Sequence, residues 1–154
     1  MLSGAARRGF ASIAAGLVAG TTNLIAAGMI FGGTLTHGLQ SIASGLIGER
    51  AFSGGAPTAV LGVCLHYAIS IIAAAIYGEA AAGNKLLRER WLVGGTVFGV
   101  IAYAVMNLVV VPLSHAANPD FSLAVVVKEL LAHAIMFGIP IAGIVVGLSR
   151  SQHK

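Results

Sequence analysis

Charged residues are scarce in this sequence, and that scarcity excludes most kinds of soluble protein. Only 9% of the 154 residues are charged, whereas 57% are hydrophobic. Soluble domains carry about 25% charged residues, and a chain with so few has too little polar surface to cover a globule in water. The composition therefore predicts a protein that is surrounded by lipid.

Basic residues are too few and too dispersed for nucleic-acid binding. The net charge is +4, and the nine Lys and Arg residues mostly stand in small groups at the ends of apolar segments. A nucleic-acid-binding protein needs a basic face with residues that read the bases, and the sequence has no such pattern. Charges placed in this way instead orient a membrane protein.

Cysteine is nearly lacking, and so are motifs of catalysis. Cys64 is the single cysteine and lies in an apolar run, so it forms no internal disulfide and is expected to act as a small hydrophobic side chain. The sequence has no nucleophile with its base, no phosphate-binding loop and no dinucleotide motif. We therefore predict that the protein is not an enzyme.

Long hydrophobic runs are what the sequence does have. A helix that crosses a membrane needs about 20 apolar residues, and four segments qualify: residues 10–31, 57–77, 91–113 and 122–148. No domain boundary or long linker separates them, so residues 1–154 form one integral-membrane domain. Because the 21 glycines let membrane helices approach closely, we predict an all-α, polytopic four-helix bundle.

The loop between the first two spans carries a helical pattern of its own. Leu35, Leu39, Ile42 and Leu46 recur at helical spacing, with His37, Gln40, Ser41 and Ser44 largely between them. Such a pattern predicts a short amphipathic helix that lies on the outer membrane surface.

Basic residues predict the orientation. Seven fall on one side of the four spans and two, Arg50 and Lys128, on the other. The seven are Arg7, Arg8, Lys85, Arg88, Arg90, Arg150 and Lys154. The positive-inside rule places both termini in the cytoplasm, with Arg7 and Arg8 anchoring a retained first helix. Tyr77 and Trp91 are expected at the inner interface.

Each span has one face of small and polar residues, and these faces are predicted to turn inward. They carry six polar side chains expected to meet within the membrane: His66, Glu129, His133, Asn107, Asn23 and Tyr103. Ionisable groups at this depth usually face the bundle interior and mark a functional site. Glu129 and His133 are four residues apart and so share a helix face. Pro140 should loosen the helix near Met136 and free a backbone carbonyl.

Several chemistries remain open for this cluster. Its members could hydrogen-bond between helices and fix the bundle, or form a proton relay, because histidine titrates near neutral pH. His66, Glu129 and His133 also have the composition of a transition-metal site, and two histidines near the midplane could ligate haem. No cofactor is predicted apart from these alternatives.

Three stretches together resemble a known family. They are HYAISIIAAAIY in the second span, MNLVVVPL at the end of the third and ELLAH at the start of the fourth. This order is similar to that of the YagU-like family of bacterial inner-membrane proteins. The resemblance implies a bacterial inner-membrane location and marks His66, Tyr77, Pro112, Glu129 and His133, without implying a biochemical activity.

The sequence thus favours a small inner-membrane protein with a structural, accessory or stress-adaptation role, in contact with the lipid bilayer and not with nucleic acid. One alternative is a proton or small-solute transporter or channel subunit that acts as a homo-oligomer. A second alternative is a metal- or haem-binding membrane protein.

Overall fold

The computed structural model describes residues 4–117 and 120–150, and all regular secondary structure there is helical. The helices, in chain order, are α1 (Gly4–Phe31), α2 (Leu35–Ile47), α3 (Arg50–Ser53), α4 (Gly55–Gly83), α5 (Lys85–Glu89), α6 (Trp91–Val105), η1 (Met106–Val110), α7 (Leu123–Ala132), η2 (His133–Gly138) and α8 (Ile139–Arg150). The segments η1 and η2 are π-helical: η1 continues α6, and η2 joins α7 to α8. The predicted all-α fold is confirmed.

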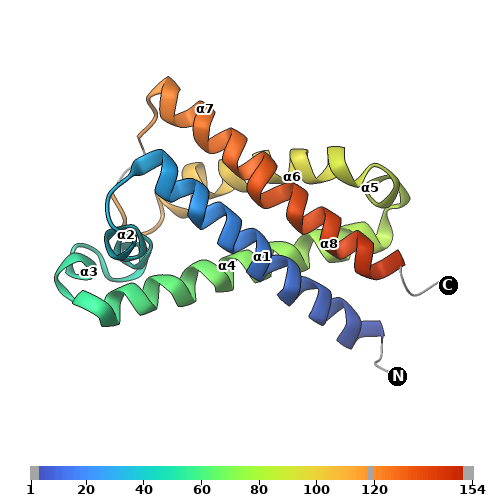
Figure 1. The fold of residues 1–154 in the computed structure, drawn as a ribbon, viewed down its shortest axis with the longest axis horizontal. Helices are drawn as coiled ribbons and strands as arrows, with labels where there is room; N and C mark the ends of the chain where they lie inside the picture. Colours follow the sequence, from blue (N-terminus) through green and yellow to red (C-terminus); the bar gives the residue numbers. More distant parts are fainter. Residues whose placement is uncertain (1–3, 118–119, 151–154) are drawn as a thin grey trace.

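Four segments of this structure are long and apolar enough to cross a membrane. They are Gly4–Phe31, Gly55–Gly83, Trp91–Val110 and Leu123–Ser149. They coincide with the four predicted spans and pack along one another (Figure 1). The chain is therefore built as a multi-pass membrane protein.

The fourth span holds the bundle together. Its α8 half contacts α1, α4 and α6, and its η2 segment contacts α1 and α6. The buried cluster around it is built largely from alanine, with Tyr77, Phe137 and Ile141 as its larger members. Large aliphatic side chains such as Ile72 and Ile101 lie outside, 59% and 53% exposed. This distribution suits lipid, because small interior residues let helices approach while branched residues meet the acyl chains.

Glycines bring helices of the four spans into backbone contact at two places. A side chain at Gly99 of α6 would meet the carbonyl group of His133, and one at Gly138 would meet the backbone of Gly95. On the other side of the bundle, Gly16 of α1 lies directly against the backbone of Ile71. The predicted small-residue faces of these spans therefore do turn inward.

A helix, α2, is present where the sequence predicts an amphipathic helix between the first two spans. Thr34 caps its start, since the Thr34 hydroxyl accepts a hydrogen bond from the His37 amide at 3.2 Å. It is seen end-on in Figure 1 and so crosses α4 steeply, with the carbonyl of Leu39 over Gly62. Gln40 is buried at this contact and donates to the carbonyl of Gly55 at 3.2 Å. One of the polar residues of α2 therefore fastens it to α4.

Tyr77 lies deeper than the sequence predicts. It was expected at the inner interface, but α4 continues to Gly83, and Tyr77 is only 2% exposed. Its ring packs edge-on against Phe98 at 5.2 Å between centroids. Glu79, the one acidic residue in this extension, pairs with Arg8 at 3.1 Å. Tyr77 is therefore a core residue, whereas Trp91 is half-buried at the start of α6.

Each π-helical segment ends two residues before a proline. The segment η1 precedes Pro112, and the Val111 amide donates to the carbonyl of Met106 at 2.8 Å. The segment η2 precedes Pro140. Proline has no amide hydrogen and crowds the carbonyl four residues earlier, and a widened turn relieves that crowding. The predicted loosening near Met136 is therefore seen as η2.

The two ends of the bundle differ in charge. Both ends of the described chain and α5 lie at one end, which carries Arg7, Arg8, Lys85, Arg88 and Arg90 (Figure 1). The opposite end carries α2, α3 and the start of α7, with Arg50 and Lys128. Arg150 ends α8 at the basic end, and Lys154 lies outside the described residues.

Candidate intramembrane polar site

The structure sorts the six predicted polar residues into two groups. Tyr103, Glu129 and His133 lie where α6 contacts α7 and η2, and Asn107 follows Tyr103 by one turn, in η1. The other two, His66 and Asn23, lie on α4 and α1. Asn23 is half-buried, and within the described chain no hydrogen bond joins it to the other five.

The first group is centred on His133, the first residue of η2. The His133 Nδ1–H donates to the carbonyl of Glu129, one turn earlier, at 2.9 Å. The ring of Tyr103 stands edge-on to the imidazole, 5.5 Å away between centroids. Asn107 donates to the carbonyl of Tyr103 at 3.1 Å. The buried Tyr103 hydroxyl has no hydrogen-bond partner among the described residues.

The second group links α4 to α1. His66 Nε2 lies 2.8 Å from the carbonyl oxygen of Gly20, and because a carbonyl only accepts, the imidazole nitrogen is the donor. The Tyr67 ring stands edge-on to His66 at 5.5 Å. The Tyr67 hydroxyl shares a 2.8 Å hydrogen bond with the hydroxyl of Thr21. No hydrogen bond joins His66 to His133 in the described part of the chain.

Thr22 connects α1 to the fourth span. Its hydroxyl donates to the carbonyl of Met136 in η2. Met136 is four residues before Pro140, so this is the carbonyl that loses its usual helical donor. We call Gly20, Thr21 and Thr22 the α1 hub, because this single turn of α1 bonds to both α4 and η2.

Thr21, Thr22 and Tyr67 were not among the residues predicted from the sequence. The acceptor of the Thr22 hydrogen bond could be predicted from the sequence, because Pro140 has no amide hydrogen and leaves the carbonyl of Met136 without its usual helical donor. The donor could not be chosen from sequence, because a threonine in a membrane helix can equally bond to its own backbone. Both threonines do so as well: Thr21 donates to Leu17 and Thr22 contacts the carbonyl of Val18.

The predicted metal site is not formed by His66, Glu129 and His133. Among the described residues, no group of three or more His, Cys, Asp or Glu side chains is placed to hold a metal ion. The reason is visible in the hydrogen bonds: the imidazoles point their donor nitrogens at different backbone carbonyls, His66 toward α1 and His133 along its own helix. His66 would have to leave Gly20 before that nitrogen could ligate a metal or haem.

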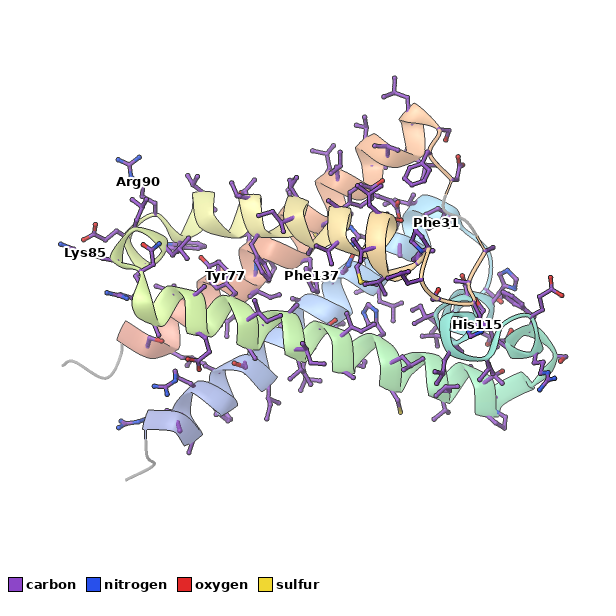
Figure 2. The ribbon with its side chains drawn as sticks, turned by 180° about the vertical axis from the view of Figure 1, so that it is seen from behind. Phe31, Tyr77, Lys85, Arg90, His115 and Phe137 are labelled. Carbon is purple, nitrogen blue, oxygen red and sulfur yellow. The ribbon has the colours of Figure 1, made fainter. Side chains whose placement is uncertain are left out.

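An apolar layer lies between the polar site and the basic end of the bundle. Tyr77 and Phe137 are buried there. In Figure 2 both residues lie between the end of the bundle that carries Lys85 and Arg90 and the opposite end. Ile141 and Ala142, both fully buried, belong to the same layer. The ionisable side chains of the site are therefore separated from the basic end by packed hydrocarbon and aromatic rings.

No family model matches this chain, and no curated protein or solved structure is found to be similar to it. What the chain does must therefore be inferred from its own contacts.

Proposed function

We propose that this protein is a structural or accessory component of a bacterial inner membrane. The observation that carries the proposal is the α1 hub. His66 and Thr22 both bond to backbone carbonyls of a neighbouring helix, and Thr21 bonds to Tyr67. The polar groups at membrane depth are thus used to join helices.

The physical chemistry of lipid supports this use. Membrane helices gain no hydrophobic driving force from associating, so close packing and interhelical hydrogen bonds hold them together. The glycine contacts at Gly16, Gly99 and Gly138 supply the close packing, and the hub supplies the hydrogen bonds. Exposed aliphatic side chains cover the outside of the bundle. These features together suit a compact helix bundle embedded in lipid.

The same proposal includes the orientation of the bundle and the kind of membrane that holds it. The basic end, with Arg7, Arg8 and the residues of α5, faces the cytoplasm, because positive loops remain on that side. The resemblance of the second, third and fourth spans to YagU-like proteins supports the bacterial inner membrane.

A proton-flux assay in proteoliposomes tests the structural role. Wild-type protein and Glu129→Gln are compared with protein-free vesicles under an imposed pH gradient. The proposal expects the same slow leak in all three. A wild-type flux that Glu129→Gln abolishes would contradict a purely structural role.

A second candidate is proton transfer by a homo-oligomer, and the surroundings of His133 favour it. His133 opens a π-helical segment, a feature often found at functional sites. The buried Tyr103 hydroxyl faces no partner within the described part of the chain. Because the apolar layer blocks the way to the basic end, a second copy would have to complete the path. If this candidate is right, Tyr103→Phe and Glu129→Gln both lose flux in the same assay.

A further inference from the structure

Three arginines line a cleft at the basic end of the bundle. The cleft has a volume of about 400 Å³, within the roughly 300–1,000 Å³ typical of small-ligand pockets. Arg7 and Arg8 come from α1, and Arg88 comes from α5. Arginines from two helices therefore border one space.

The three arginines are held in different ways. Arg88 donates from Nη1 to the carbonyls of Ala81 and Ala82, at 2.6 and 2.8 Å, and so caps the end of α4. Arg8 pairs with Glu79 at 3.1 Å, but both side chains are at least half exposed, and exposed pairs are weak. The Nε of Arg7 is buried and has no hydrogen-bond partner among the described residues. Arg7 is thus the arginine of this cleft with a buried nitrogen that no described residue bonds.

The rest of the lining is mixed, with the serines Ser12 and Ser149 beside apolar residues. Ala11, Gly78, Val145 and Val146 form part of the wall between α1, α4 and α8. A free phosphate ion would use only the polar part of the lining, whereas a phospholipid would also place its glycerol and first methylene groups against this apolar wall. The start of α1 at Gly4 adds the positive end of a 28-residue helix, while the ends of α4 and α8 add partial negative charge.

We propose that this cleft binds the phosphate headgroup of an anionic phospholipid. The group that it recognises is a phosphate oxygen, for which guanidinium groups are well suited. Basic pockets between membrane helices bind anionic lipid headgroups in this manner. The site lies apart from the α1 hub and goes beyond the structural role proposed above, since it adds a defined lipid ligand.

Native mass spectrometry of the detergent-purified protein tests the site. The protein is incubated with phosphatidylglycerol or with phosphatidylcholine of the same acyl chains, and the retained lipid is counted. Wild type should retain phosphatidylglycerol preferentially, and Arg7→Gln should reduce that retention about fivefold. Arg50→Gln is the matched control, because Arg50 is exposed at the opposite end of the bundle, and should leave retention unchanged.

Two additions keep the result unambiguous. Glu79→Gln removes the carboxylate that competes for Arg8 and should increase retention of phosphatidylglycerol, a gain that misfolding cannot imitate. Inorganic phosphate at millimolar concentration should not displace the lipid; complete displacement would assign the site to free phosphate and overturn the lipid proposal. Equal retention of the two lipids, or equal losses in Arg7→Gln and Arg50→Gln, would overturn it as well.

Discussion

At the scale of single residues, polar side chains in this protein bond mainly to backbone carbonyls. His66, His133, Thr22 and Asn107 all do so. A carbonyl left without a donor in lipid costs free energy because no water can replace the lost hydrogen bond. Thr22 supplies such a donor, since its hydroxyl bonds to the Met136 carbonyl, to which Pro140 cannot donate because it has no amide hydrogen.

Thr22→Val should destabilise the bundle. Valine keeps the shape of threonine but removes the donor to Met136, and interhelical hydrogen bonds in membranes contribute about 0.6 kcal/mol on average and up to about 1.7 kcal/mol. The free energy of unfolding, measured by SDS titration in mixed micelles, should fall by an amount in this range. Thr96→Val is the control, because Thr96 bonds only to Leu92 of its own helix among the described residues. Equal losses in the two variants would be inconsistent with an interhelical role for Thr22.

His66→Phe should weaken the contact between α1 and α4. Phenylalanine keeps a ring against Tyr67 but leaves the carbonyl of Gly20 without its bond from α4. The same titration should show a loss of about 1 kcal/mol. Tyr67→Phe should cost less, because Thr21 keeps its bond to Leu17. A larger loss for Tyr67→Phe than for His66→Phe would argue against the assigned importance of His66.

At the scale of helices, glycine decides which spans touch. Gly99→Ala should push α6 away from η2, because the added methyl group would meet the carbonyl group of His133; overpacking of this kind typically costs about 1–3 kcal/mol. Gly28→Ala is the matched control, since nothing lies within 4 Å of a side chain there. It should be neutral or should stabilise α1 by up to about 1 kcal/mol. Thermal unfolding in detergent compares the two, and a tolerated Gly99→Ala would refute the close contact.

Helix positions were predictable, but helix irregularities were only partly so. Apolar run length marks a span directly, so the four spans were found within a few residues. Pro140 predicted a loosened helix near Met136, but not its π-helical form, because a proline can equally produce a kink. The extension of α4 past Tyr77 was missed, because apolar run length marks the part of a helix that suits lipid and not the end of the helix itself.

At the scale of the whole molecule, the predicted single cluster is divided between two helix pairs. Periodicity showed which residues share a face, but it does not show which helix a face meets. Tertiary packing decides which of the four spans are neighbours in the bundle. His66 therefore lies against α1, and His133 lies against α6.

The orientation of the bundle gives a prediction at this scale. In a Cys64→Ala background, Glu49→Cys and Glu89→Cys place one exposed thiol at each end of the molecule. A membrane-impermeant maleimide should label the cysteine at position 49 in spheroplasts, and the one at position 89 only after the inner membrane is permeabilised. The reverse pattern would show that the positive-inside rule fails for this chain.

The central claim is that the α1 hub joins the helices through a carbonyl freed by proline. A double-mutant cycle of Thr22→Val and Pro140→Ala measures it, because alanine restores an amide donor near the Met136 carbonyl. The account predicts that Thr22→Val costs about 1 kcal/mol in the wild-type background and close to nothing beside Pro140→Ala. Equal costs of Thr22→Val in the two backgrounds would contradict the claim.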